Sequence, residues 1–388
     1  MNSRPSPASD GRAGRYAIQP GGYRAFIPAP LPPDPPVALD DGLLALLSEA
    51  DRELARLDAA TEFLPNPDLF VRMYVRKEAV LSSQIEGTQA SLVDLLEHEA
   101  RAPVAEAKDV LEVSNYVRAM NLGLERLASL PLSLRLIREI HAELLRGVRG
   151  QHLAPGEFRR SQNWIGPPGG TLAEATFVPP PPQEVEPALA AFERFLHDER
   201  PIPLLVRTAL IHAQFETIHP FLDGNGRIGR LLITFFLCAH QALRRPTLYL
   251  SHFFKQHRQE YYERLQAVRD AGAFEAWVQF FLRGVRDVSR EGTETARQVQ
   301  HLRESNRALV HKLARGSGAG HVLLDALFAQ PVVTVEYVRR IVSRSFPAAN
   351  QLVADFVRLG LLRQISLGAR NRVFAYQPYL DIFGELKP

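Results

Sequence analysis

The sequence is poor in cysteine, and Cys238 is its only one. A single thiol cannot form a disulfide within the chain, which points to a reducing compartment. Cys238 lies in an apolar run, residues 231–239, that is much shorter than the roughly 20 residues a membrane helix needs. We therefore expect a buried helix with an inert thiol there and no membrane association. The opening Met-Asn-Ser-Arg-Pro-Ser-Pro-Ala lacks the apolar core of a secretory leader, so we expect a cytoplasmic protein.

The chain also lacks a large charge of one sign. It has 46 Lys and Arg against 43 Asp and Glu, a net charge of +3, which gives no argument for nucleic-acid or membrane binding by the chain as a whole. Only the C-terminal segment has an unbalanced charge, because residues 310–388 hold ten Lys and Arg against five Asp and Glu. Metal hydrolases are disfavoured, since no HExxH or comparable spacing relates the central histidines.

Proline and glycine mark the N-terminal region, residues 1–40, which we expect to be an extended arm. From there apolar residues recur at helical spacing, predicting an N-terminal helical region over 41–130 and a helical core over 131–300. Beyond a first helix after Asp40, the predicted helices cover about 68–86, 90–99, 106–128, 132–147, 184–197, 202–217, 227–242, 254–270 and 273–299. The body of the chain is therefore predicted to be all-α.

Two segments break the helical pattern. Residues 156–182 contain two short extended stretches around a glycine- and proline-rich turn, which predicts a β-hairpin flap. The glycines at 316–320 predict a flexible linker over 301–320.

The last segment, 321–388, has a mixed pattern. Three helices are predicted near 321–329, 334–342 and 347–359, followed by strands at 362–366 and 372–376. This is the order of a winged helix-turn-helix domain. Because its positive charge is modest and spread out, DNA binding and contact with a protein or a second copy of the chain both stay open.

The residues best suited to catalysis are concentrated in one segment, His219-Pro-Phe-Leu-Asp223-Gly-Asn-Gly-Arg227-Ile-Gly-Arg230. Gly224 and Gly226 let backbone amides approach a ligand closely, and a glycine-rich turn before a helix N-terminus binds phosphate. Asn225 can add a side-chain donor. Asp223 beside this turn suits Mg²⁺, which prefers one or two carboxylates together with substrate phosphates.

Two arginines and a histidine complete the set. Arg227 and Arg230 are three residues apart on the following helix, so they share a face and can clamp the outer phosphates. A neutral His219 can take the proton from an attacking hydroxyl. Each residue alone is usually structural, but together they predict a phosphoryl- or nucleotidyl-transfer site.

This segment resembles the Fic motif, His-x-Phe-x-(Asp/Glu)-Gly-Asn-Gly-Arg-x-x-Arg, at every defined position, and the resemblance extends over most of the chain. It implies a Fic-type helical domain that moves AMP from Mg·ATP onto a Ser, Thr or Tyr hydroxyl of a protein. By the same resemblance His219 is the base, Asp223 the metal ligand, residues 224–226 the diphosphate cradle and Arg230 the contact to the γ-phosphate.

The resemblance also assigns residues outside the motif. The flap would hold a target segment by strand addition, with Phe177, Val178 and Pro179 setting the register of the modified residue. Tyr261 and Tyr262 would line the adenine side, although adjacent tyrosines in an amphipathic helix are more often partly core. Modification of the enzyme itself and a homodimer are expected as well.

A second motif, Ser82-Ser-Gln-Ile-Glu86-Gly87, resembles the inhibitory (Ser/Thr)-x-x-x-Glu-(Gly/Asn) helix of the same family. Its position fits the class with this helix before the Fic core and a C-terminal winged-helix domain. Glu86 would occupy Arg230, the guanidinium that should hold the γ-phosphate, so ATP would bind in an unreactive pose. The plain alternative is a helix end with Gly87 as its cap and a solvated Glu86.

The reaction type rests on Gly226. Doc-like members that transfer a γ-phosphoryl group replace this second glycine with a bulkier residue, so its presence favours AMP transfer. The alternatives are removal of AMP from a modified protein, transfer of UMP or phosphocholine, and a DNA-binding regulator that acts through its tail.

Overall fold

A computed structural model describes residues 11–62, 64, 66–100, 108–167, 169–313, 317–366, 368 and 371–384. The start of the expected N-terminal arm, residues 1–10, and residues 314–316 of the expected linker lie outside this set. In the described part of the chain, no helix is long and apolar enough to cross a membrane.

The protein is mostly helical. Its helices are α1 (Asp41–Glu62), α2 (Pro67–Ile85), α3 (Leu92–Ala100), α4 (Lys108–Leu127), α5 (Leu134–Leu144), α6 (Pro182–Leu196), α7 (Leu204–Ile218), α8 (Asn225–Ala239), α9 (Ser251–Gln256), α10 (Arg258–Ala271), α11 (Phe274–His311), α12 (Ser317–Ala329), α13 (Val335–Ile341), α14 (Phe346–Arg358) and α15 (Gln377–Ile382). The strands are β1 (Gly14–Ile18), β2 (Arg24–Pro28), β3 (Val332–Thr334), β4 (Arg363–Gln364) and β5 (Val373–Ala375). A short 3₁₀ helix covers Leu172–Glu174.

Local sequence sets several of the helix ends. Pro67 opens α2, where its missing N–H costs nothing, and the Ser133 hydroxyl accepts from Leu136 N at the start of α5. Gly272 ends α10 in the left-handed conformation. The helix expected over 254–270 is instead divided at His257 into α9 and α10.

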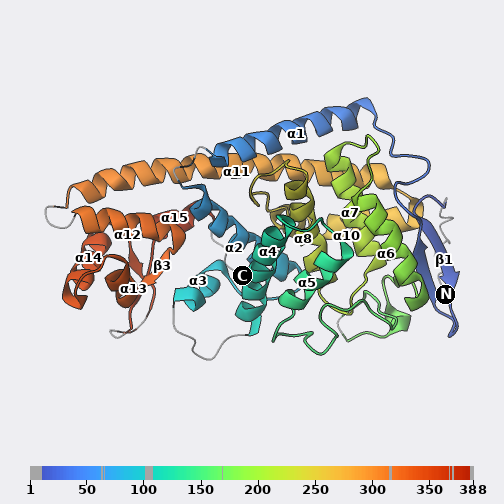
Figure 1. Cartoon of the computed structure of the whole chain (residues 1–388), viewed down its shortest axis with the longest axis horizontal. Helices are drawn as coiled ribbons and strands as arrows, with labels where there is room; N and C mark the ends of the chain where they lie inside the picture. The colour runs from blue at the N-terminus through green and yellow to red at the C-terminus, as the bar shows by residue number, and fades with distance from the viewer. Residues whose placement is uncertain are drawn as a thin grey trace.

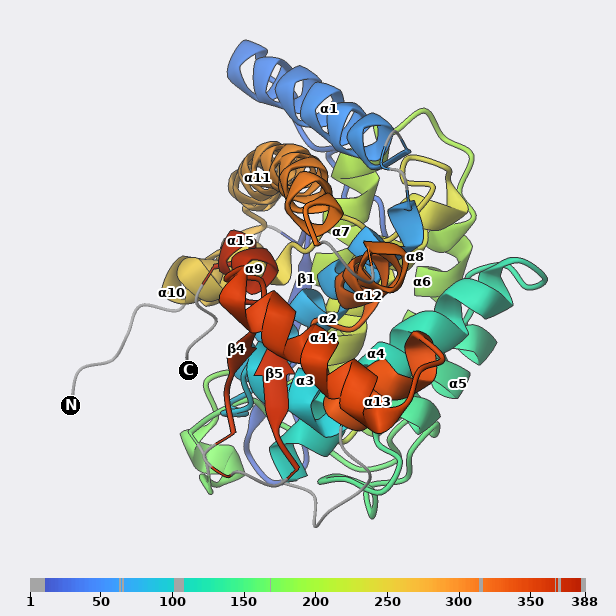
Figure 2. The ribbon, with the colours of Figure 1, turned by 90° about the vertical axis from the view of Figure 1, so that its left-hand side faces the viewer.

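The long helix α11 spans most of the molecule, and α1 lies beside it in both views (Figures 1 and 2). Beneath them α7 is buried along nearly its whole length, its polar and charged side chains included. The next helix, α8, packs against α7. The residues that join these two helices are those of the motif.

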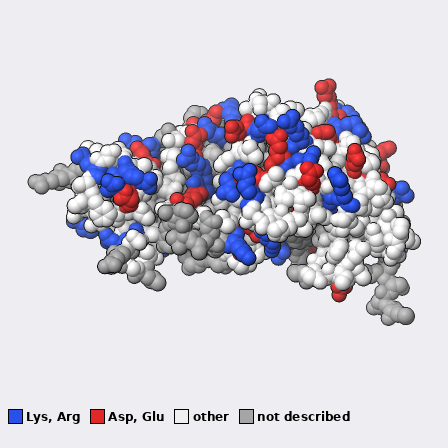
Figure 3. Space-filling view, turned by 60° about the horizontal axis from the view of Figure 1, so that its bottom comes forward, with Lys and Arg blue, Asp and Glu red and all other residues white. Residues whose placement is uncertain are grey.

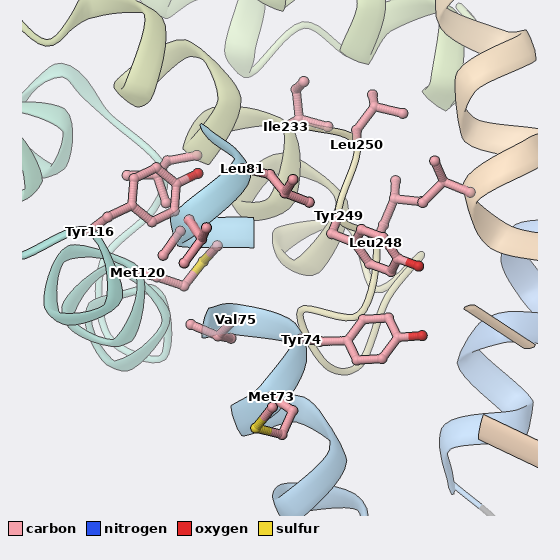
Figure 4. Close-up of a cluster of buried hydrophobic side chains, with 14 of the residues drawn as sticks. Met73, Tyr74, Val75, Leu81, Tyr116, Met120, Ile233, Leu248, Tyr249 and Leu250 are labelled. Atoms are coloured by element: carbon pink, nitrogen blue, oxygen red, sulfur yellow. The ribbon is translucent and has the colours of Figure 1, made fainter. Parts of the chain in front are cut away.

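Helix α2 is held in place by aromatic and aliphatic packing. Figure 4 shows its Tyr74, Val75 and Leu81 among side chains of α4, α8 and the segment before α9. The rings of Tyr74 and Tyr249 are 4.7 Å apart and nearly perpendicular, a favourable aromatic geometry. The C-terminal end of α2 is thereby directed at the start of α8.

The N-terminal arm is not simply extended. β1 and β2 form an antiparallel hairpin with Tyr16 opposite Phe26, and Phe26 N donates to Val178 O at 2.9 Å. The hairpin therefore lies along one edge of the flap. The proline-rich composition of this region does not predict this pairing, because the pairing depends on contact with residues far along the chain.

The linker predicted over 301–320 is largely helical. α11 continues to His311 because Asn306 and Val310 extend its buried stripe, and α12 begins at Ser317. Gly320 is needed where the two helices meet, since a Cβ there would lie 2.7 Å from the Val310 side chain.

The C-terminal unit has the predicted order of helices and a small sheet. β5 pairs with β3 on one side and β4 on the other, all antiparallel. The unit packs against the rest of the protein: the ring of Phe383, just after α15, lies 5.7 Å from that of Tyr74 in α2, and β3 contacts α3. In Figure 2 this unit lies below the long helices α1 and α11.

Candidate active site

His219 forms the C-terminal cap of α7 in the left-handed conformation, with φ 48° and ψ 59°. Its N–H donates to Phe215 O at 2.9 Å. Burial, followed by the charges of Arg269 and Arg159, lowers the pKa of His219 to about 3. The imidazole is therefore neutral at pH 7 and can accept a proton.

Asn225 fixes the loop between His219 and α8. Its Oδ1 accepts from Phe221 N and its Nδ2 donates to Phe221 O, both at 2.8 Å. The side chain is buried. In this structure the Asn225 amide therefore holds the loop and is not directed at a phosphate, which differs from the expected role as a phosphate donor.

The glycine turn has the geometry that an anion site needs. Gly224 has φ 76° and precedes the first turn of α8, whose N–H groups have no partner within the helix. A Cβ on Gly226 would lie only 2.3 Å from Glu86 Oε1. The carboxylate of Glu86 therefore lies directly over this turn.

Asp223 is held by its neighbours. Its Oδ1 accepts from Gly224 N at 2.6 Å, and its main-chain oxygen bonds His141 Nε2 at 3.0 Å. Because Gly156 N donates to Nδ1 of the same ring, the proton of His141 is on Nε2. Its imidazole also stacks on Phe221, with ring centroids 3.7 Å apart.

Asp223 is the one carboxylate in the motif that could bind a metal ion. Among the described residues, no group of three or more His, Cys, Asp or Glu could hold a metal by itself. The partly exposed Asp223 beside the turn fits Mg²⁺ that arrives with ATP and is held mainly by phosphates.

In this structure the guanidinium of Arg227 is not free to bind phosphates at the glycine turn. It is buried and pairs with Glu112 of α4 at 3.2 Å and with Asp223 at 3.6 Å. Its guanidinium therefore supports Asp223, and the expected pairing of Arg227 with Arg230 around the outer phosphates is not present in this structure.

Arg230 is bound by helix α2. Its Nη2 lies 2.7 Å from Glu86 Oε1 and 3.0 Å from Ser82 O, while its Nε donates to Ser82 Oγ at 2.8 Å. The arginine side chain is 2% exposed and that of Glu86 is 32% exposed. Burial opposes the ionised form of Glu86, but the charge and hydrogen bonds of Arg230 outweigh it and hold the pKa below its usual value.

The two adjacent tyrosines of α10 lie in different environments. Tyr261 is 1% exposed, and its hydroxyl bonds His212 Nε2 at 2.9 Å. It belongs to the core and does not line an adenine site. Tyr262 is 41% exposed, and burial, followed by the charge of Glu86, raises its pKa.

The flap is smaller than the predicted hairpin. Its two stretches meet in a single bridge between Ile165 and Phe177, because prolines on both stretches have no N–H to donate. Phe177, Val178 and Pro179 are buried, and Phe177 lies 3.8 Å beneath the Arg269 guanidinium. In this structure their side chains face the core, so they are not available to contact a target.

Three further residues at the site were not singled out from the sequence. Arg159 and Asn163, in the flap segment, donate to His219 O. Glu216, one turn before His219, is buried, and burial raises its pKa to about 7. A Cβ on Gly229 would lie 2.2 Å from its Oε1. Their sequence context carries no signal that separates them from surface residues.

Comparison with known proteins agrees with this geometry. A family model described as Fic/DOC family N-terminal matches residues 44–125, and one described as Fic/DOC family matches residues 131–237. A crystal structure of a Fic family protein from Desulfovibrio desulfuricans has a TM-score of 0.56 and 18% identity, with 88% of this chain and 97% of that chain covered. This likeness concerns the fold alone.

Two curated relatives are similar over part of their length. A probable protein adenylyltransferase of Aquifex aeolicus is 31% identical over 174 residues, which are 43% of this chain and 49% of that protein. The protein adenylyltransferase Fic of Aedes aegypti is 33% identical over 151 residues, 38% of this chain and 27% of that protein. The chain thus spans about half the length of these relatives or less.

Proposed function

The chain belongs to the Fic/DOC family, and from this premise we propose that it is a protein adenylyltransferase restrained by its own Glu86. It would transfer AMP from Mg·ATP to a hydroxyl of a protein. The names of the Aquifex and Aedes relatives support this activity. The neutral histidine beside a glycine turn supports it from the geometry.

The proposed step uses residues of this chain in distinct roles. The hydroxyl oxygen of the target attacks the α-phosphorus while His219 takes its proton. The bond from the α-phosphorus to the bridging oxygen breaks, and diphosphate leaves. The N–H groups at the start of α8 and the guanidinium of Arg230 would bind the phosphates, and Asp223 would hold the Mg²⁺ that ATP brings.

Self-restraint rests on the position of Glu86. Its carboxylate lies 2.7 Å from Arg230 Nη2 and above Gly226, where a Cβ could not fit. An ATP γ-phosphate would need the same guanidinium. Glu86 and the phosphate therefore compete for one partner, while the two bonds to Ser82 would keep Arg230 in place after Glu86 leaves.

The experiment is transfer from labelled ATP to proteins of a cell lysate. Label from the α-position on protein bands, absent with His219→Ala, supports AMP transfer. Label from the γ-position alone would show phosphorylation and would overturn the proposal. UMP or phosphocholine transfer would appear only with the corresponding labelled donor.

Removal of AMP is the second candidate, and the same carboxylate favours it. Glu86 is partly exposed above the turn, so it can orient a water toward an AMP–protein bond. If Glu86→Gly abolishes AMP release from a modified target, the enzyme works in both directions.

We also propose that the C-terminal unit is a winged helix that contacts protein, including a second copy of this chain, in preference to DNA. Arg339 and Arg358 pair with acids on their own helices, and Phe346 at the start of α14 is 54% exposed. On the face in Figure 3, basic and acidic side chains are interspersed. A salt-sensitive gel shift with DNA would contradict this assignment.

A further inference from the structure

The main chain of His219 is held by two side chains from the flap segment. Its carbonyl accepts from Arg159 Nε at 2.9 Å and from Asn163 Nδ2 at 3.1 Å. The left-handed conformation of His219 is unfavourable for a residue with a Cβ. The two donors stabilise a conformation that the histidine would not keep by itself.

The same segment binds each of the two residues that follow. Arg159 N donates to Pro220 O at 2.9 Å, and Asn163 Nδ2 donates to Phe221 O at 2.8 Å. Both Arg159 and Asn163 are buried. The loop that starts at His219 is thus fixed by residues 159–163 on one side and by Asn225 on the other.

Arg159 also joins the two ends of the flap. Its Nη2 donates to Pro180 O at 2.6 Å on the returning stretch, and its Nη1 donates to Ser161 O at 3.2 Å on the outgoing stretch. Within the part of the chain that the structure describes, its partners are carbonyl oxygens and no carboxylate lies within ion-pair distance. Burying a guanidinium without a carboxylate is costly for stability, and its bonds to these main-chain oxygens offset that cost.

We propose that Arg159 and Asn163 are positioning residues, which aim the His219 imidazole at the attacking hydroxyl by fixing the His219 main chain. This assignment rests on the proposed transferase activity. Neither residue has a hydrogen bond to the glycine turn at 224–226. One guanidinium thus binds both ends of the flap and His219 O.

Kinetics separate positioning from nucleotide binding. The variants are Asn163→Asp, which replaces the donating amide with an oxygen of the same shape, and Arg159→Lys, which keeps the charge and loses the fork. Both are made in full-length Glu86→Gly protein. A misplaced base should lower kcat by about 10²-fold, while KM for ATP changes by less than about twofold, since the phosphate contacts are intact.

A matched control is Arg207→Lys in the same background. Arg207 is another buried guanidinium that donates to main-chain oxygens, those of Phe195 and Leu196 at 3.1 and 2.8 Å, near the start of α7. Its loss tests for general destabilisation, so kcat should stay near that of the background. In a His219→Ala background, Asn163→Asp should cause no further loss, because its effect acts through the histidine.

A spectroscopic readout distinguishes failure of this proposal from failure of the proposed function. Imidazole resonances of ¹⁵N-histidine protein identify His219 by their loss in His219→Ala. They should move in Asn163→Asp and Arg159→Lys and stay in Arg207→Lys, whether or not AMP transfer is found. Unmoved resonances in both folded variants, kcat within about threefold of the background, or an equal loss in the control would overturn the proposal. If Arg159→Lys does not fold, Asn163→Asp alone decides.

Discussion

Glu86, which caps the C-terminal end of α2, and Gly226 of α8 are so close that a methyl group added to Gly226 would lie 2.3 Å from Glu86 Oε1. The same carboxylate pairs with Arg230 at 2.7 Å. The glycine turn and the arginine that are proposed to bind the phosphates of one ligand are thus both covered by one side chain.

The pH dependence of transfer should reveal the environment of His219. Its pKa is lowered to about 3, so the base stays neutral well below the usual range of histidine. We expect the rate of Glu86→Gly protein to show no inflection near pH 6.5, and His219→Ala to lose about 10²-fold or more at all pH values. The measurement is kcat from pH 5 to 8 with α-labelled ATP.

The lowered pKa of His219 also determines how its contribution to the stability of the fold changes with pH. Between about pH 3 and 6.5 the unfolded histidine binds a proton that the folded one does not, so this group stabilises the fold less as pH falls through that window. An inflection of the rate at pH 6.5 that disappears in the pH profile of His219→Ala would contradict the account.

The contribution of Glu216 to the stability of the fold should change with pH in the opposite direction. Burial raises its pKa from 4.5 to about 7, so the folded protein keeps a proton that the unfolded chain loses, and stability falls as pH rises from 4.5 to 7. Glu216→Gln should therefore match the parent near pH 4.5 and be more stable at pH 8, by about 3 kcal/mol at most. Urea unfolding at the two pH values measures this. Glu263→Gln, on an exposed site, is the control for replacing a glutamate by glutamine.

The C-terminal unit should unfold together with the core. Phe383 is buried against Tyr74 of α2, so Phe383→Ala should cost about 3–5 kcal/mol and lower a single thermal transition. Phe346→Ser, at a surface site, should change stability by less than about 0.5 kcal/mol. Two separate calorimetric transitions, with only one of them moved by Phe383→Ala, would show that the unit is independent.

The sequence predicted the helical body, and the candidate reacting segment could be proposed from it because the motif is contiguous and needs no long-range contact to be found. It could not predict how side chains within the motif point. Asn225 and Arg227 turn inward because Phe221 and the Glu112 carboxylate bind them, and Glu112 lies on a helix far earlier in the chain. Tyr261 is core for the same kind of reason, its bond to His212.

Other differences come from pairing across long sequence distances. β2 pairs with the flap at Val178, although glycine and proline around β2 suggested only an extended arm. α11 continues through residues assigned to a linker because its buried stripe extends to Val310. Helix propensity and spacing do not contain these partners, since tertiary contacts decide them.

The most direct test of the account is the rate of AMP transfer by Glu86→Gly protein, measured with α-labelled ATP beside the parent chain. Removing the carboxylate frees Arg230 for the γ-phosphate, so transfer to targets should rise at least about tenfold, which corresponds to about 1.4 kcal/mol of relieved competition. The double variant Glu86→Gly with Arg230→Ala should return to low activity, because the gain depends on that arginine. Equal or lower transfer by folded Glu86→Gly protein would contradict the claim that this chain restrains itself.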